Sequence, residues 1–462
     1  MKNTYFIKKR YIVVLLVLFG ACIGCVLNLN LSVTIVELTS KKNLTIENKV
    51  HETMPEFSWS QKEKGLILSV FAYGHLCAPL GGLIASKIGG ATTFGISIAT
   101  KGVMSILSPY VIRSNITLFI FLQFLTGIFA GFCGASLIEV LLHWTPLNER
   151  SRSIILSQNG LLIGSTIAHA VSGIIIKNYG WEAVFFITGG TALVWYAIFV
   201  VLVRNTPSED KYISEAERSY LMKNINLPSK TKVIYPWKSI FTSIPVWALL
   251  NEFFTKGWIY SFFANCLPLY ISDVQRKDIQ SIGLLSSAPN LCAFIGSIIA
   301  AFIIDYLRSK HDSNIQKIYK FIIFFGQISA VVLLIVTGLW LNFNGSIICF
   351  CLLKFCFSFA ESAYQILPAE LALPYAGFIK GMSITAMSVG LIVNPTIVGF
   401  MVSDHSRSSW NKYLLFISIF NMCSLVTFLI FGSAKLQPWA KPVKNEIDDG
   451  NTLKNTNFKE KA

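Results

Sequence analysis

The stretch RNTPSEDKYISEAERSYLMKNINLPSKTKVIYPWKSI, residues 204–240, is a polar interruption in a chain that is otherwise strongly apolar. Of the 462 residues, 53% are hydrophobic and only 14% are charged, and the mean hydropathy is +0.58. Soluble globular domains carry about 25% charged residues, so this chain has too little polar surface for water and belongs to the membrane class. The polar segment therefore separates two groups of membrane spans.

Apolar stretches on both sides of this segment are long enough to cross about 30 Å of hydrocarbon, which takes about 20 residues. Hydropathy predicts six spans before the segment and six after it, at residues 11–36, 65–86, 92–110, 116–143, 154–176, 183–203, 246–271, 281–304, 321–341, 346–367, 381–402 and 413–431. The first span follows Lys8, Lys9 and Arg10 and is too long for a cleaved signal peptide. The sequence thus predicts an all-α membrane protein with twelve transmembrane helices in two six-helix halves.

Lysine and arginine residues predict that both ends of the chain are cytoplasmic, because the segments that would then lie inside hold most of them. We expect a first bundle at residues 1–203 with an extracellular or lumenal loop at 37–64, a cytoplasmic linker at 204–240, a second bundle at 241–435 and a cytoplasmic polar tail at 436–462. The net charge of +15 fits this topology and attraction to anionic lipid. No nucleic acid partner is expected.

Two short motifs recur at corresponding positions of the two halves. GGLIASKIGGATTFG, residues 81–95, follows the second span, and IIDYLRSK, residues 303–310, follows the eighth. Both resemble the cytoplasmic loop motif of the major facilitator superfamily, in which a reverse turn carries charges that bridge helix ends in one state of the cycle. Lys87, Asp305 and Arg308 are the candidates for this gating loop.

Six segments resemble one family within that superfamily. They are NLSVTIVEL at 30–38, FAYGHLCAPLGGLIASKIGG at 71–90, HWTPLNERSRS at 143–153, GWEAVFFITGG at 180–190, PWKSIFTSIPVWA at 236–248 and LPYAGFIKGMSITAMSVGLIVNP at 373–395. The chain is identified from them as a divergent member of the anion:cation symporter family, which includes sialin, the vesicular glutamate transporters and the sodium–phosphate cotransporters. The resemblance implies a major facilitator fold and a secondary active transporter of a small organic or inorganic anion, working by alternating access with a proton or sodium ion as co-substrate.

Lys256 lies near the middle of NEFFTKGWIYSFF, residues 251–263. The seventh span is expected to begin near Pro245, so Lys256 lies about 16 Å into the bilayer at about 1.5 Å per residue. A charge that faces lipid there costs at least about 2.5–3.5 kcal/mol. Lys256 is therefore predicted to face a water-filled cavity and attract an anion, or to form an ion pair with another helix. The resemblance favours the first, since the vesicular glutamate transporters have an arginine at the matching position.

Asn28 and Gln123 occupy positions at which this family usually has the arginines of its anion site. Both keep hydrogen-bonding ability but lose a fixed cation, so the same fold could instead carry a neutral or cationic solute, or act as a non-transporting sensor. Tyr73, Asn30 and Asn394 are further polar candidates for contact with the solute. Each of these residues could also be an interhelical hydrogen bond that only stabilises packing.

Coupling requires a group that changes its protonation or binds a cation. Glu361 in the tenth span and His75 in the second are the candidates, because intramembrane carboxylates are usually functional and histidine titrates near neutral pH. Glu361 could instead be neutralised by Lys354, which lies seven residues earlier on the same helix face, and His75 could be a packing residue. In the outer loop, Asn43 of NLT is a candidate glycosylation site.

Nothing in the sequence predicts an enzyme. The six histidines form no paired His/Asp motif, and CIGC, residues 22–25, has CxxC spacing without a second cluster of Cys or His. We therefore expect no catalytic residue, no metal site and no cofactor beyond the coupling ion. The expected partners are a small-molecule anion and the lipid bilayer, and the expected state is a monomer in the plasma membrane or in an endolysosomal or vesicular membrane.

Overall fold

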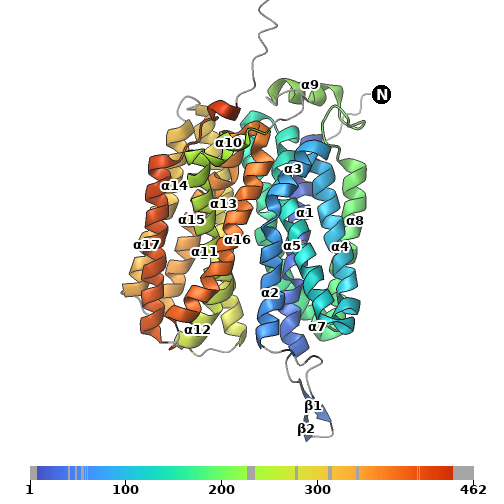
Figure 1. Cartoon of the computed structure of the whole chain (residues 1–462), viewed down its shortest axis with the longest axis vertical. Coiled ribbons are helices and arrows are strands. Elements are labelled where there is room, and N and C mark those ends of the chain that lie inside the picture. The colour runs from blue at the N-terminus through green and yellow to red at the C-terminus, as the bar shows by residue number, and fades with distance from the viewer. Residues whose placement is uncertain are drawn as a thin grey trace, which may run out of the picture.

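The computed structural model describes residues 8–39, 42–46, 49–53, 57, 59, 61–225, 235–275, 279–310, 315–339, 343–402, 404 and 406–440. Nearly all of them lie in helices that stand side by side in two groups (Figure 1). The first group comprises α1 (Lys9–Thr39), α2 (Gln61–His75), α3 (Ala78–Ile88), α4 (Gly90–Ser114), α5 (Ile116–Trp144), η1 (Leu147–Glu149), α6 (Arg150–Gln158), α7 (Gly160–Tyr179) and α8 (Trp181–Leu202).

The second group follows two short helices, α9 (Glu215–Asn224) and α10 (Trp237–Phe241), which lie at one end of the molecule (Figure 1). We call this the linker end. The group comprises α11 (Ile244–Ser261), the π turn η2 (Phe262–Cys266), α12 (Leu267–Gln275), α13 (Ile279–Lys310), α14 (Ile315–Leu339), α15 (Phe343–Leu371), η4 (Leu373–Tyr375), α16 (Ala376–Met401), α17 (Arg407–Phe431) and η5 (Pro438–Ala440).

Ten stretches of the described chain are long and apolar enough to cross a membrane, and an eleventh consists of Ser69–His75 and Ala78–Ile88, bent by 44°. The bend follows from Pro79, whose missing N–H interrupts the helical hydrogen bonds. The twelfth span is α11 with η2 and α12, in which Asn251, Glu252 and Lys256 interrupt the apolar residues. The prediction of two six-helix halves is thereby confirmed.

A two-stranded hairpin extends from the opposite end of the molecule, which we call the hairpin end (Figure 1). It consists of β1 (Lys42–Ile46) and the antiparallel strand β2 (Lys49–Thr53), with Asn43 opposite Glu52. The sequence predicted only a loop here, because two five-residue strands in a mostly polar stretch carry little strand signal. Asn43 is thus on β1, and its glycosylation stays a prediction.

The polar segment between the halves is fixed to the start of α1. The carboxylate of Glu217 on α9 accepts hydrogen bonds from the backbone N–H groups of Lys9 and Arg10, at 2.8 and 3.2 Å. These donors belong to the first turn of α1 and would otherwise have no partner within the helix. The Lys9 ammonium also lies 3.7 Å from Asp210. Residues 226–234 of the expected linker, and 441–462 of the expected tail, lie outside the described residues.

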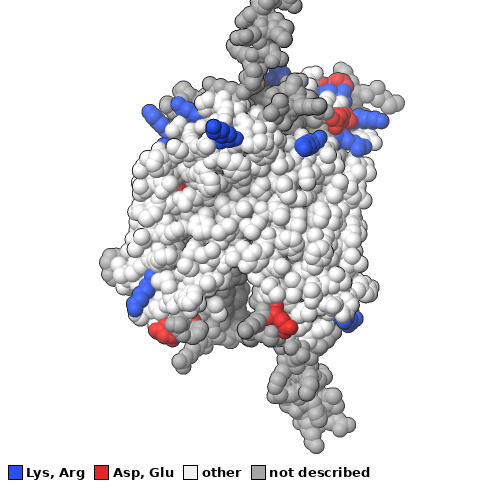
Figure 2. All heavy atoms as spheres, in the orientation of Figure 1, with Lys and Arg blue, Asp and Glu red and all other residues white. Residues whose placement is uncertain are grey.

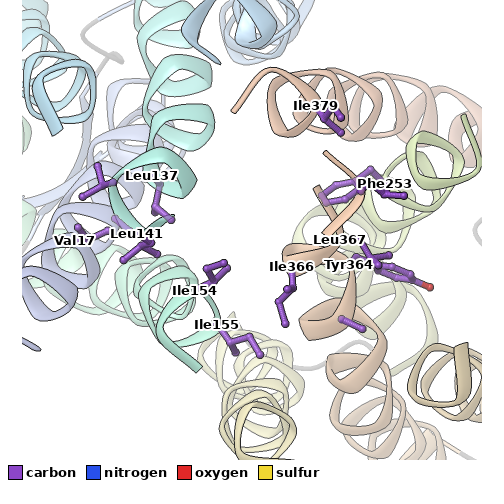
Figure 3. Packing of buried hydrophobic residues seen from close by; sticks show 14 of the residues in the cluster. Val17, Leu137, Leu141, Ile154, Ile155, Phe253, Tyr364, Ile366, Leu367 and Ile379 are labelled. Atoms are coloured by element: carbon purple, nitrogen blue, oxygen red, sulfur yellow. The ribbon is translucent and has the colours of Figure 1, made fainter. Parts of the chain in front are cut away.

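The two halves touch at the linker end on two sides. There α3 packs on α16, and a Cβ atom added to Gly82 would overlap the carbonyl oxygen of Gly377. On the other side α6 packs near α13 and α15, where Ile154 and Ile155 point toward Ile366 (Figure 3). These residues belong to one hydrophobic core that continues from the first half into the second. The linker end is therefore closed.

The hairpin end differs, since the space-filling view is hollowed between the two halves there (Figure 2). On the same face, charged side chains gather at both ends, and the broad band between them is almost free of charge (Figure 2). An uncharged band of this kind suits the hydrocarbon of a bilayer. The structure thus has the shape of a membrane protein that is closed at the linker end and open between its halves at the hairpin end.

Candidate functional site

An ion pair joins two helices inside the second half. The Nζ atom of Lys256 on α11 lies 2.7 Å from Oε1 of Glu361 on α15, and 7% of the lysine side chain and 27% of the glutamate side chain are exposed. The sequence left two positions open for Lys256, a cavity or an ion pair with another helix. The structure forms the ion pair with an acid that keeps part of its surface accessible.

Two more lysines surround Glu361. The carboxylate interacts electrostatically with Lys354 and Lys380 as well as with Lys256. Lys354 lies seven residues before Glu361 on the same face of α15. Its Nζ is 5.0 Å from the centre of the Phe263 ring. Both lysines are almost completely buried, at 4% and 2% exposure. The predicted pairing of Lys354 with Glu361 is therefore an electrostatic interaction rather than a salt bridge.

Lys380 is a site residue that the sequence analysis missed. Its Nζ donates a hydrogen bond to Oε1 of Gln365 on α15 and lies 4.9 Å from the centre of the Phe253 ring. The predicted span began at residue 381, five residues too late, since α16 begins at Ala376. Because of this boundary, Lys380 was read as a loop residue. Its position inside a long apolar stretch without another charge was the signal that could have identified it.

We call Lys256, Lys354, Lys380, Glu361 and Gln365 the lysine cluster. It borders the first half, because Tyr260 of α11 interacts electrostatically with both Glu361 and Cys25 of α1. Lys256 and Lys380 share Phe253, with the Lys256 ammonium 5.5 Å from the centre of the same ring. Aromatic faces attract cations, so the ring holds both ammonium groups without neutralising either.

The first half contributes a buried lysine of its own. Lys101 on α4 is 1% exposed, and its Nζ donates a 2.8 Å hydrogen bond to the carbonyl oxygen of Gly24 on α1. Its charge reaches His75, the predicted coupling histidine, whose ring lies 4.7 Å from that of Phe71. A neighbouring cation disfavours a second positive charge on the imidazole. This environment favours the packing role that was left open for His75.

Asn28 and Gln123, at the family's arginine positions, lie on α1 and α5. The Oδ1 atom of Asn28 is buried and has no hydrogen-bond partner among the described residues, and Gln123 is 7% exposed. A buried polar atom without a partner is uncommon and requires an explanation such as a missing ligand. Tyr73 on α2 is 45% exposed and contributes no contact to the lysine cluster that the structure records.

Asn30 and Asn394 have protein partners. The Nδ2 atom of Asn30 donates to Oγ1 of Thr188 at 2.7 Å, which ties α1 to α8. Asn394 is fully buried, donates to the Cys266 sulfur at 3.5 Å and accepts a hydrogen bond from the Tyr413 hydroxyl. Both amides therefore join helices. This favours the packing alternative for Asn394, whereas the Oδ1 of Asn30, like that of Asn28, is buried without a hydrogen-bond partner among the described residues.

The predicted gating residues lie at the closed linker end. Asp305 on α13 accepts a hydrogen bond from the backbone N–H of Arg152 at 3.3 Å, and the Arg152 Nε lies 3.8 Å from the same carboxylate. Because Arg152 belongs to α6, this contact crosses between the halves. Lys87 is exposed at the end of α3. Of these two, only Asp305 is seen to bridge the halves.

Arg308 lies on the same side of the linker end as Asp305. Its Nη1 lies 2.6 Å from Oε1 of Glu370 on α15 and 3.4 Å from Oγ of Ser151 on α6. The ion pair stays within the second half, while the hydrogen bond reaches the first. On the other side, Oε1 of Glu139 accepts a 3.1 Å hydrogen bond from the backbone N–H of Gly377. Polar contacts therefore join the two halves on both sides of the linker end, between α6 and α13 and between α5 and α16.

Tyr235, just before α10, also spans the two halves. Its hydroxyl lies 2.8 Å from Oγ of Ser86 on α3, and its ring centre is 5.2 Å from that of Tyr375 and 5.8 Å from that of Phe378. Burial raises the pKa of Tyr235 to about 12, against the hydrogen bond to Ser86, which lowers it. The hydroxyl therefore stays protonated at physiological pH, and this contact does not change with pH.

No group of three or more His, Cys, Asp or Glu side chains in the described part of the chain is arranged to hold a metal ion. Charged binding chemistry is instead concentrated in the lysine cluster, in which three ammonium groups lie around one carboxylate. Such a cluster can attract an anion. Lys256 can also exchange its partner for another anion, because Glu361 is the most exposed member of the cluster.

Comparison with known proteins agrees with this arrangement. The family model for the Major Facilitator Superfamily matches residues 17–395. The chain is 29% identical over 443 residues to vesicular glutamate transporter 2 of Homo sapiens, covering 94% of this chain and 76% of that protein. It is 29% identical over 450 residues to vesicular glutamate transporter 3 of Danio rerio, covering 96% and 76%.

Among solved structures, the fold is similar to that of the major facilitator proton:xylose symporter XylE bound to 6-bromo-6-deoxy-D-glucose. The TM-score is 0.71, and the match covers 94% of this chain and 98% of the other. At 12% sequence identity, this likeness concerns the fold alone.

Proposed function

The chain belongs to the Major Facilitator Superfamily, and from this premise we propose that it is a secondary active transporter that moves a small anion across a membrane by alternating access. It is a multi-pass membrane protein, and its relatives are transporters rather than enzymes. The names of the vesicular glutamate transporters support an anion as the solute.

The observation that carries this proposal is the Lys256–Glu361 ion pair. A buried cation needs a partner, because an uncompensated charge in a low dielectric is strongly unfavourable. Glu361 is that partner here, and it is also the more exposed of the two side chains. A solute anion that reaches the pair can take the place of the Glu361 carboxylate on Lys256 without leaving the ammonium uncompensated at any stage.

The same exchange offers a route for coupling. A proton that binds Glu361 removes its negative charge and with it most of the attraction to Lys256. The freed ammonium then accepts the solute anion, so that proton and anion occupy the site together. Release of the proton restores the ion pair and expels the anion. A sodium ion bound to Glu361 would act in the same way and is distinguished below by the gradient that drives uptake.

Alternating access requires that the closed end opens. The contacts that must break are those between the halves at the linker end, chiefly Arg152–Asp305 and the close approach of Gly82 to Gly377. The solute would enter from the hairpin end in the state described here and leave at the linker end after these contacts separate.

We further propose that the linker end is cytoplasmic, with both chain termini, and that the hairpin lies outside the cell or in a lumen. The positive charges of the linker and tail support this orientation. The membrane is proposed to be the plasma membrane or an endolysosomal or vesicular membrane. Residues 1–203 and 241–435 would be the two transport bundles.

Uptake into proteoliposomes tests the proposal. Labelled glutamate, sialate, urate and phosphate would each be offered with a pH gradient, with a sodium gradient and with neither. We expect uptake of at least one anion that depends on a gradient, that Lys256→Gln abolishes it and that Lys412→Gln, at an exposed position of α17, leaves it unchanged. Full anion uptake by the Lys256→Gln protein, or uptake of neutral or cationic solutes only, would contradict the proposal.

A further inference from the structure

The lysine cluster has more positive charge than its own acid can neutralise. Three lysine side chains interact with one carboxylate, so the site holds two more basic groups than acidic ones. The only salt bridge among the described residues of the cluster is Lys256–Glu361. The next carboxylate on α11, Glu252, is bonded to Gln327 on α14 and forms no salt bridge with any of these lysines. The excess is therefore a property of the site itself.

The side chains in direct contact with Lys354 and Lys380 are neutral. Lys354 faces the ring of Phe263, and Lys380 faces the ring of Phe253 and donates to the Gln365 amide. An aromatic face or an amide oxygen orients an ammonium group but does not cancel its charge. Holding such cations out of water is unfavourable by several kcal/mol each, by general estimates for buried ions, unless negative charge arrives. Two negative charges would satisfy the site completely.

The cations are distributed along one helix rather than gathered at a point. On α15 Lys354, Glu361 and Gln365 follow one another at spacings of seven and four residues, which place them on one face. At about 1.5 Å per residue, Glu361, which holds Lys256, and Gln365, where Lys380 is bound, are about 6 Å apart along the helix axis, and Lys354 is about 10 Å from Glu361 in the other direction. The two carboxylates of a short dicarboxylate can span one such helical turn, which one compact ion does not.

The site has no group for an additional cation. An amino acid brings an ammonium group, which needs an acceptor with negative charge. Glu361 is paired with Lys256 in the empty site and, in the proposed cycle, is neutralised by a proton when the solute takes its place, so a further cation beside three lysines would be repelled.

We propose that the lysine cluster binds a small dicarboxylate with two negative charges, in preference to an amino acid such as glutamate. This inference rests on the proposed function as an anion transporter. One carboxylate takes the place of Glu361 on Lys256, and the second lies against Lys354 or Lys380. The solute therefore differs in net charge from the one that the relatives are named for.

Binding to the purified full-length protein tests the inference. Isothermal titration would compare succinate and glutarate with glutamate, butyrate and phosphate. We expect the preferred dicarboxylate to bind at least about tenfold more tightly than glutamate and butyrate. Lys354→Gln and Lys380→Gln should weaken dicarboxylate binding by about tenfold and leave butyrate binding within about threefold. Lys412→Gln should change neither.

Lys354→Arg and Lys380→Arg keep the positive charge and should retain the preference, which separates loss of charge from loss of folding. If the Gln variants do not fold, the preference of the wild-type protein alone decides. Glutamate or phosphate binding as tightly as the dicarboxylates would overturn the inference, as would an equal loss for all ligands in both Gln variants. Those results would leave the proposed function intact if Lys256-dependent uptake of another anion persists, whereas absence of any anion uptake would defeat both.

Discussion

Lys256 of α11 and Glu361 of α15 are in contact at 2.7 Å inside the second half, and the acid is nearly four times as exposed as the base. The lysine is thus enclosed, while the carboxylate faces a more open space. The asymmetry suits a pair whose acidic member is replaced during a transport cycle.

The first prediction concerns the stability of this pair. Removing one partner leaves a buried charge without compensation, which is expected to lower stability by about 3 kcal/mol, whereas removing both leaves no charge to compensate. Lys256→Gln and Glu361→Gln should therefore each lower the melting temperature of the detergent-purified protein more than the double variant does. A double variant less stable than either single one would show that the pair does not determine stability.

The second prediction concerns coupling. Glu361→Gln keeps the shape of the side chain but cannot gain or lose a proton, so Lys256 stays available at every pH. We expect anion exchange to continue in proteoliposomes while accumulation driven by a pH gradient disappears. Glu215→Gln, at an exposed position of α9, is the control and should behave as wild type. Accumulation by the Glu361→Gln protein equal to wild type would assign coupling to another residue.

The third prediction concerns closure of the linker end. A methyl group at Gly82 would overlap the Gly377 carbonyl oxygen, so α3 and α16 must separate in Gly82→Ala. Hydrogen exchange measured by mass spectrometry should then become faster in the first turns of α16. Gly190→Ala on α8 places the same methyl group where nothing lies within 4 Å and should leave exchange unchanged. Equal protection in both variants would mean that the Gly82 contact does not hold the closed state.

The fourth prediction concerns the hairpin. If this end of the protein faces a lumen or the cell exterior, Asn43 on β1 is accessible for glycosylation. In a glycosylating eukaryotic host, Asn43→Gln should increase the electrophoretic mobility by one glycan. Asn344, in the sequon NGS, lies in the first turn of α15, and Asn344→Gln should cause no shift. The absence of a glycan on the wild-type protein would contradict the assigned orientation or site.

The fifth prediction separates packing from solute contact at Asn394. Because its oxygen accepts from Tyr413, Tyr413→Phe removes a buried hydrogen bond and should lower stability by about 1–3 kcal/mol. Since both residues only join helices, the preference among anions should stay the same in thermally stable preparations. A changed order of preferred anions in the Tyr413→Phe protein would return Asn394 to the list of solute-binding residues.

Much of this fold could be predicted from the sequence because hydropathy is a local property. The spans, their division by residues 204–240 and the recurrence of the loop motif around Asp305 all follow from short windows. Asp305 contacts Arg152 of the other half, a partner that the sequence did not identify, and its gating role stays a prediction. The β1–β2 hairpin escaped prediction because its pairing depends on a turn in a polar loop.

The site was harder to predict because its members come from distant parts of the chain. Glu361 and Lys256 were both selected, but as separate solute and coupling residues, since no periodicity reveals which side chains of two helices meet. Lys380 was lost through an error of a few residues in a helix boundary. The amides of Asn30 and Asn394 look alike in sequence, and only their partners Thr188 and Tyr413 in the structure distinguish them.

The polar character of α11 has a consequence for biosynthesis. With Asn251, Glu252 and Lys256 along its length, this helix is a poor candidate to leave the translocon for lipid on its own, since a central charge alone opposes insertion by about 2.5–3.5 kcal/mol. The acid that pairs with Lys256 is synthesised much later, on α15. We therefore expect α11 to stay beside the translocon or a chaperone until α15 supplies the counter-charge. On this view the helices of the second half enter the lipid together rather than one by one.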